Sequence, residues 1–183
     1  MKLSSKKVLM IVQLVLIAVP ACMSLWALTI TKGVGTGMLA DIFTLAALVF
    51  AILYIVNGCT KEDARFYKSF LIAYALALLA DGSFKCKYFG NGYLCFTAYG
   101  ILCILCVAEN LGKKKSLIMG WIVVICTALV LGSTLILTPG VLRGGDEMST
   151  QSVIRAGANF SMALIMLIMI FAKYKDKEAR GSV

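Results

Sequence analysis

Histidine is absent from the whole chain of 183 residues. Its absence excludes serine–histidine catalytic triads, histidine-ligated zinc and general bases built on an imidazole ring. Cysteine does not replace it as a metal ligand, because most of the seven cysteines lie inside apolar segments. We therefore expect neither a metal nor a cofactor in this protein.

Acidic residues are scarce, at nine against eighteen lysines and arginines, which gives a formal net charge of +9. A basic chain can bind nucleic acid, but here the cations sit in short clusters between apolar runs. That pattern is typical of the signals that orient a protein in a membrane. We therefore expect membrane lipids rather than nucleic acid as the partner.

Proline is also rare, with two residues, and no repeat or long linker divides the chain. By contrast, 61% of the residues are hydrophobic and the mean hydropathy is +0.92. Soluble domains are normally about half apolar or less. A chain with so many hydrophobic residues exposes apolar side chains on its outside, and such a surface suits lipid. The sequence predicts a single transmembrane domain over residues 1–183, an all-α polytopic helix bundle. Its six predicted helices, each long enough for a bilayer core of roughly 30 Å, are 8–30, 38–56, 66–84, 92–110, 116–137 and 152–172.

The seven cysteines are odd in number and scattered along the chain. This usage is typical of small packing residues rather than of a disulfide framework. Cys103 and Cys106 have the spacing of a redox pair, but they lie inside an apolar helix. We expect free thiols, with a Cys86–Cys95 bond as the one exception to look for.

Loop charges give an independent prediction of orientation. If the N-terminus is cytoplasmic, the inner segments hold thirteen lysines and arginines and the outer segments hold four, with Arg155 at the membrane edge. Because lysine and arginine gather in short cytoplasmic loops, we predict a cell-membrane protein with both termini in the cytoplasm. The inner cations are Lys2, Lys6, Lys7, Lys61, Arg65, Lys68, Lys113, Lys114, Lys115, Lys173, Lys175, Lys177 and Arg180; the outer ones are Lys32, Lys85, Lys87 and Arg143.

Three ionisable residues fall at the ends of predicted spans. Asp41 opens the second span, Asp81 closes the third and Arg155 begins the sixth, so all three share a depth near the outer face. A charged group at membrane depth is costly and normally has a partner or a function. We predict that the three residues converge in one pocket in the outer leaflet.

Helical spacing extends this predicted pocket inward. Residues three, four or seven apart share one face of a helix, so we expect Asn159, Tyr74 and Tyr99 to line its deeper wall. The predicted inward faces are Tyr67, Tyr74 and Asp81 on the third helix; Tyr99, Cys103, Cys106 and Asn110 on the fourth; and Arg155, Asn159, Met162, Met166 and Met169 on the sixth.

Two interpretations of this cluster are open. In the first, Arg155 pairs with Asp41 or Asp81 as structural support, and the other groups face interfacial water. In the second, the cluster binds a lipid headgroup or a small-molecule substrate, with the arginine on a phosphate or carboxylate and an aspartate handling protons. The aspartate that Arg155 leaves unpaired is then the candidate acid.

The stretch from about Leu53 to Lys115 resembles the first half of the lysoplasmalogenase (YhhN) family. A helix ends in Leu78 to Asp81, an aromatic loop follows from Tyr88 to Gly92, and the next helix opens with Tyr93 to Tyr99. The resemblance implies a membrane enzyme that hydrolyses the vinyl-ether bond of a lysolipid and releases a fatty aldehyde. Asp81 carries over as its catalytic candidate, while the histidine of the family has no counterpart here.

Two other functions suit the same pattern. Six helices in a chain of 183 residues are also expected of the substrate-binding membrane component of an energy-coupling-factor transporter. Such a component implies an outward-facing pocket for a small molecule. A non-catalytic membrane scaffold or immunity protein is the third possibility, so the sequence leaves open whether the protein is an enzyme.

Overall fold

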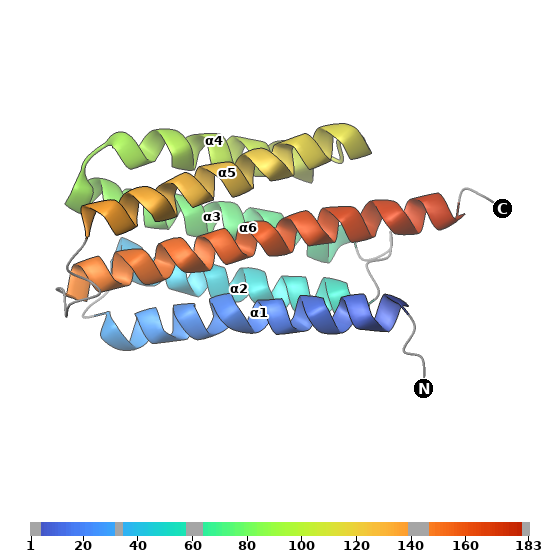
Figure 1. Cartoon of the computed structure of the whole chain (residues 1–183), viewed down its shortest axis with the longest axis horizontal. Helices are drawn as coiled ribbons and strands as arrows, with labels where there is room; N and C mark the ends of the chain where they lie inside the picture. Colours follow the sequence, from blue (N-terminus) through green and yellow to red (C-terminus); the bar gives the residue numbers. More distant parts are fainter. Residues whose placement is uncertain (1–4, 32–34, 58–63, 139–146, 181–183) are drawn as a thin grey trace.

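The computed structural model describes residues 5–31, 35–57, 64–138 and 147–180. These residues form six helices and no strand, and the predicted all-α bundle is confirmed (Figure 1). The helices are α1 (Ser5–Ile30), α2 (Thr36–Val56), α3 (Ala64–Phe89), α4 (Gly92–Ala108), α5 (Lys113–Leu137) and α6 (Glu147–Arg180).

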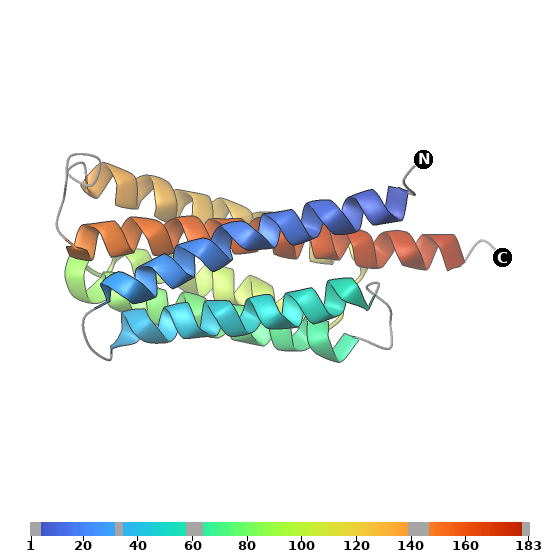
Figure 2. The same ribbon diagram turned by 90° about the horizontal axis from the view of Figure 1, so that it is seen from below.

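The helices run alternately up and down, and both chain termini lie at the same end of the bundle (Figure 1). We call this the terminal end, and the opposite end, where α2, α4 and α6 begin, the far end. Each helix packs against the next along the chain, and α6 closes the ring against α1 (Figure 2). Because α6 also contacts α2 and α3 across the ring, α3 and α6 are the central helices. Their most apolar stretches are 67% and 72% buried, against 28% for α1.

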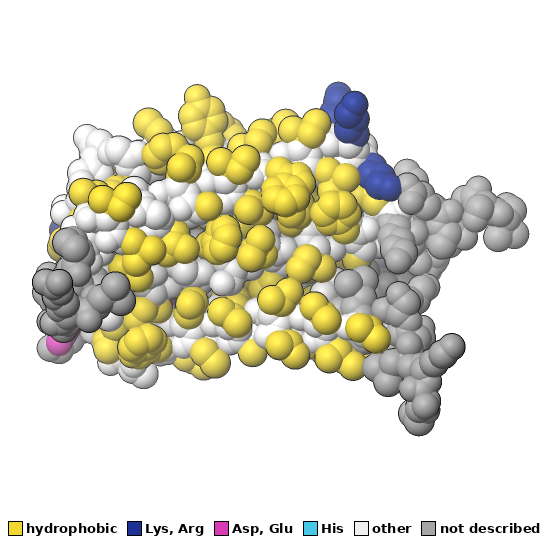
Figure 3. Space-filling model, viewed as in Figure 1, with side chains coloured by type: hydrophobic (Ala, Val, Ile, Leu, Met, Phe, Trp, Pro, Cys, Tyr) yellow, Lys and Arg dark blue, Asp and Glu magenta, His cyan; other side chains and the backbone are white. Residues whose placement is uncertain are grey.

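The outside of the bundle is apolar along its length. Large hydrophobic side chains cover the face in Figure 3 between its two ends, and Trp26, Trp121 and Ile136 are each more than half exposed. All helices except α4 are long and apolar enough to cross a membrane. The apolar helix α4 has 17 residues, close to the shortest span of about 17. The chain therefore has the character of a multi-pass membrane protein.

Two helices, α3 and α6, extend five or more residues beyond a predicted end. α3 continues to Phe89 rather than ending at residue 84, so Lys85 is a fully buried helical residue, and its assignment to an outer loop is wrong. The helix ends at Gly90, whose φ of +95° favours glycine because other residues meet a steric penalty there. α6 has 34 residues, about 51 Å at 1.5 Å per residue, and so exceeds the thickness of a bilayer core.

The middle of the bundle is a core of large side chains from the two central helices. Met162, Met166 and Met169 of α6 are fully buried, as are Phe70 and Tyr74 of α3. The inward faces predicted for the third and sixth helices are therefore confirmed. This packed core separates the terminal end from the polar groups at the far end.

Candidate functional site

A buried salt bridge joins α6 to α2 at the far end of the bundle. The Nη2 atom of Arg155 lies 2.8 Å from Oδ2 of Asp41, and its Nε lies 3.1 Å from the same oxygen. Both side chains are 2% exposed. Arginine and carboxylate meet here through two donors, which fixes their relative orientation as well as their distance.

Thr31, which follows α1, and Gln151 on α6 accept further hydrogen bonds from the Arg155 guanidinium. Nη2 also donates to Thr31 Oγ1 at 2.9 Å, and Nη1 donates to Gln151 Oε1 at 3.2 Å. The amide of Gln151 in turn donates to the carbonyl of Ile30 at 2.8 Å. The ring of Phe84 lies 4.7 Å from the guanidinium carbon, where its π face stabilises the cation. The end of α1 is therefore tied into the cluster through Arg155.

A second buried salt bridge lies within α3. Lys85 Nζ is 2.5 Å from both carboxylate oxygens of Asp81, four residues earlier in the helix. The amide of Asn159 on α6 donates to Asp81 Oδ2 at 2.8 Å, and its backbone carbonyl accepts from Tyr74 OH at 2.7 Å. Because Asn159 follows Arg155 by one helical turn, α6 links the two salt bridges.

Gly37 allows the guanidinium to approach α2 closely. A Cβ atom at this position would lie 2.5 Å from Nη1 of Arg155, which is well inside van der Waals contact. Gly37 is in the first turn of α2, one turn before Asp41. Position 37 therefore has to lack a side chain for Arg155 and Asp41 to meet as they do.

The two salt bridges form a neutral cluster that is costly to bury. None of the four charged side chains is more than 4% exposed. Removing ions from water costs several kcal/mol each, and pairing offsets this only when the remaining donors and acceptors are also bonded. The hydrogen bonds of Arg155 to Thr31 and Gln151, and of Asn159 to Asp81, supply part of that completion. Within the described residues, this far-end ionic cluster is Asp41, Asp81, Lys85 and Arg155.

The structure brings most of the predicted site residues together. Asp41 and Arg155 are in direct contact, and Asp81, Asn159 and Tyr74 are joined by hydrogen bonds. Tyr99 is different: it is 63% exposed, so its predicted place in the deeper wall is wrong. The inward face predicted for the fourth helix is also wrong. Of its four residues, only Cys103 is buried, and Asn110 is exposed like Tyr99.

Lys85 is the member of the cluster that sequence reasoning missed. Its proximity to the predicted outer loop suggested a solvent-exposed cation. The signal that was available is its spacing from Asp81, because oppositely charged residues four apart in a helix are neighbours. Its burial means that Asp81, which Arg155 leaves unpaired, has a cationic partner after all.

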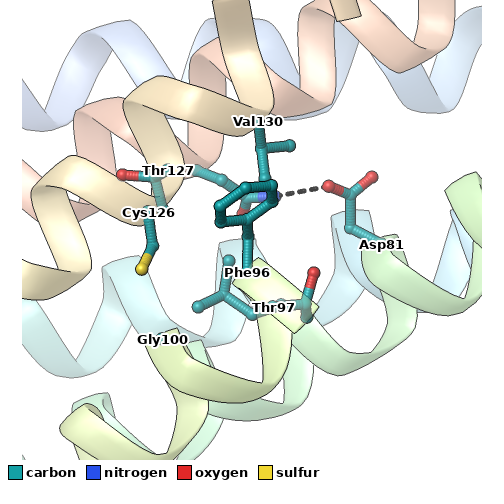
Figure 4. A pocket seen from close by; sticks show the side chains of 9 residues that line it. Asp81, Phe96, Thr97, Gly100, Cys126, Thr127 and Val130 are labelled. Atoms are coloured by element: carbon teal, nitrogen blue, oxygen red, sulfur yellow. Dashed lines mark hydrogen bonds between the residues drawn. The ribbon is translucent and has the colours of Figure 1, made fainter. Parts of the chain in front are cut away.

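A small lateral pocket lies beside Asp81, between α3, α4, α5 and α6 (Figure 4). Asp81 points across it toward the Asn159 amide, and Thr97 and Thr127 contribute from α4 and α5. Its volume of about 10 Å³ is close to the minimum of about 10–15 Å³ for one water molecule. The Thr97 and Thr127 hydroxyls donate to their own helix backbones, which leaves their oxygens as acceptors.

A larger far-end cavity of about 230 Å³ opens above Arg155. It is lined by the ends of α1 and α3 and by the first turns of α2 and α6. Four of its lining residues contact the Arg155 guanidinium or would do so with a Cβ atom: Thr31, Gly37, Phe84 and Gln151. Arg155 therefore lies behind the lining of this cavity, while none of the four cluster residues is itself a lining residue.

The described cysteines are free thiols, including Cys86 and Cys95, while Cys59 lies outside the described residues. Cys86 Sγ donates to Asn91 Oδ1 at 2.9 Å. Within the described part of the chain, no three cysteine or acidic side chains gather in a way that could hold a metal ion.

Comparisons of the chain with models of known protein families, with curated proteins and with solved structures each find no match. The function therefore has to be inferred from the residues and geometry of the site.

Proposed function

We propose that the protein is the small-molecule-binding component of a transport system in the cell membrane, with both termini in the cytoplasm and the far end outside. The observation that carries this proposal is the far-end ionic cluster beneath a cavity, at one end of an otherwise apolar bundle. Ionisable groups inside membrane bundles are expensive, and they commonly mark ligand or ion pathways.

Charge distribution supports the proposed orientation. The sequence segments at the terminal end hold thirteen lysines and arginines against five acidic residues, a net of +8 out of the total of +9. Lys85 was counted with the outer side and Arg155 at the membrane edge, yet both are neutralised inside the bundle. Of the four predicted outer cations, Lys87 is then the exposed one among the described residues, and Lys32 and Arg143 lie outside them. This contrast is stronger than the sequence count implied, and it favours a cytoplasmic terminal end.

The test is whether the protein carries and delivers a water-soluble molecule. The protein would be purified from its own membranes in mild detergent, and small molecules released by heating would be identified by mass spectrometry. We expect one polar compound to be enriched over a mock purification. Cells without the protein should lose uptake of that compound and regain it with the wild-type chain. Unchanged uptake after deletion would refute the transport role.

Lysoplasmalogenase-like hydrolysis is a second candidate, and the lateral pocket beside Asp81 favours it. In vinyl-ether hydrolysis a proton adds to the alkene carbon remote from oxygen, and water adds to the carbon bonded to oxygen. The resulting hemiacetal breaks into an aldehyde and an alcohol, and the water returns a proton to the protein. The pocket has room for about one water, and its lining residue Asp81 accepts a hydrogen bond from the Lys85 ammonium.

Two features of the site support hydrolysis less than binding. Asp81 accepts hydrogen bonds from both Lys85 and Asn159, so its carboxylate oxygens are already engaged by donors within the bundle. The lateral pocket, at about 10 Å³, is also too small for an alkenyl chain. Hydrolysis is tested by incubating the purified protein with lysoplasmalogen micelles and measuring fatty aldehyde. Aldehyde release that Asp81→Asn abolishes without unfolding the protein would favour the enzyme, and none above a protein-free control would exclude it.

A further inference from the structure

The wall of the far-end cavity combines aromatic rings with one exposed cation. Phe84 and Tyr88 pack with ring centroids 4.8 Å apart, and Lys87 Nζ lies 5.6 Å from the Tyr88 ring. Lys87 is exposed and, among the described residues, forms no salt bridge. Its ammonium is therefore available to a ligand, whereas the ammonium of Lys85, two residues earlier, is fully occupied by Asp81.

Arg155 lies behind the lining of the cavity. The lining residue Gly37 has no side chain, and a Cβ atom there would meet Nη1 of Arg155. Arg155 is paired with Asp41, so this buried pair adds no net charge to the cavity, and the cationic side chain of the lining is that of Lys87. The single acidic side chain among the lining residues is Glu147, which is itself engaged in another interaction.

The start of α2 supplies donors to the same cavity. Its N-cap residue is Gly35, no side chain caps the helix, and the first backbone bond is from Leu39 N–H to Gly35 O. The N–H groups of Thr36, Gly37 and Met38 therefore lack an intrahelical acceptor. Together with the Lys87 ammonium, these donors make the cavity suited to an anion.

We propose that the far-end cavity binds a phosphate group that carries a small organic substituent, with Lys87 as its direct charge partner. This inference rests on the proposed function and names the ligand class of that same site. The volume of about 230 Å³ lies below the roughly 300–1,000 Å³ of typical drug-sized pockets, so the ligand is small. Phe84, Tyr88 and Met38 pack against its substituent.

Binding of sn-glycerol 3-phosphate to the purified protein tests the site directly by isothermal titration calorimetry. We expect saturable binding that Lys87→Gln weakens about tenfold, equivalent to about 1.4 kcal/mol. The matched control is Lys114→Gln, because Lys114 is an exposed lysine at the terminal end and its loss should leave the affinity unchanged. Equal effects of the two substitutions would overturn the site.

A second variant tests the sign of the ligand charge. Glu147→Gln removes a negative charge from the cavity wall and should tighten binding of the phosphate several-fold. Weaker binding would mean that the wall selects a cationic group, which would overturn the assignment to an anion. Circular dichroism and gel filtration would establish that each variant keeps the helical fold.

A phospholipid headgroup carries the same phosphate chemistry as a soluble ester, and a second arm distinguishes the two sources. Native mass spectrometry would measure phosphatidylglycerol retained by wild-type and Lys87→Gln protein. Lys87-dependent binding of the soluble ester assigns a soluble ligand, and Lys87-dependent retention of lipid alone assigns a headgroup. Independence of both from Lys87 overturns the site. A co-purified transported compound whose binding ignores Lys87 would preserve the proposed function while removing this site.

Discussion

At the far end of the bundle, α3 and α6 meet through charged and amide side chains, whereas further along the same two helices they meet through methionines and aromatic rings. The change is symmetrical: buried residues lie 7, 11 and 14 positions after Arg155 on α6 and 7, 11 and 14 positions before Asp81 on α3. These are Met162, Met166 and Met169, and Tyr74, Phe70 and Tyr67.

The two regions are equally buried but depend on different physics. In the far-end ionic cluster, each buried charge is stabilised by its oppositely charged partner. The contribution to the free energy of unfolding therefore belongs to the pair and not to either residue alone. In the apolar middle, each side chain fills volume, and its loss leaves a cavity that neighbours close only in part. A second substitution can remove the stranded partner of a broken pair, whereas a second truncation only enlarges a cavity. Among the described residues, buried charge is confined to the end where the cavity opens, which is the end that we propose binds a ligand.

The largest expected effect comes from breaking the Arg155–Asp41 pair on one side. Arg155→Ala strands the buried Asp41 carboxylate and should lower the free energy of unfolding by about 3–5 kcal/mol. Asp41→Asn should cost less, because an amide oxygen still accepts from the guanidinium. Thermal unfolding in detergent, followed by tryptophan fluorescence, measures both. Adding Asp41→Ala to Arg155→Ala should recover part of the loss, and a further loss instead would mean that the pair is not coupled.

Truncation in the apolar middle should come next. Met166→Ala removes a fully buried side chain of α6 and should cost about 2–5 kcal/mol. Met148→Ala, at an exposed methionine of the same helix, is the matched control and should change the melting temperature little. No second substitution to a smaller residue should rescue Met166→Ala, in contrast with the ionic pair.

Gly37→Ala should have an intermediate effect confined to the far end. Its Cβ would meet the Arg155 guanidinium at 2.5 Å, and overpacking of this kind typically costs about 1–3 kcal/mol. Gly92→Ala is the control, since an added Cβ there meets nothing within 4 Å. If both substitutions leave the melting temperature unchanged, the guanidinium does not lie against α2 as described.

The smallest effects should separate Tyr74 from Tyr99. Tyr74→Phe loses the hydrogen bond to the Asn159 carbonyl and should cost about 0.5–1.5 kcal/mol. Tyr99→Phe alters an exposed ring and should stay within about 0.5 kcal/mol. Denaturant titration of the two variants compares them. A larger loss of stability for Tyr99→Phe than for Tyr74→Phe would mean that Tyr99 lies in the interior, as the sequence predicted.

Hydropathy predicted the helices well because each apolar run is bounded by charges or glycines, and the shared depth of Asp41, Asp81 and Arg155 followed from those bounds. The inward face of α4 could not be predicted, since that helix is apolar on all sides and carries no periodic signal of its orientation. Lys85 was missed because a lysine at a helix end is normally solvated. Its burial is set by Asp81 and by packing that lies outside the local sequence.

The far-end cavity was beyond sequence reasoning for a different reason. Its lining comes from three parts of the chain that are far apart in sequence, namely the end of α1 with the start of α2, the end of α3 and the start of α6. Behind this lining, Gly37 admits the Arg155 guanidinium against α2. Glycines close together in a sequence are typical of turns, so Gly37 carried no sign of a close contact. The sequence predicted which polar residues lie at this end of the bundle, but it did not predict the cavity.

Labelling of a single cysteine in the far-end cavity tests most directly the claim that this end faces outward and binds a ligand. Thr36→Cys would be placed in a background without the native cysteines, with Lys114→Cys as the terminal-end control, and intact cells would be treated with a membrane-impermeant maleimide. We predict that position 36 is labelled in intact cells and protected by sn-glycerol 3-phosphate, whereas position 114 is labelled only after permeabilisation. Labelling of position 114 in intact cells, or of position 36 only after permeabilisation, would contradict the orientation and with it the proposed site.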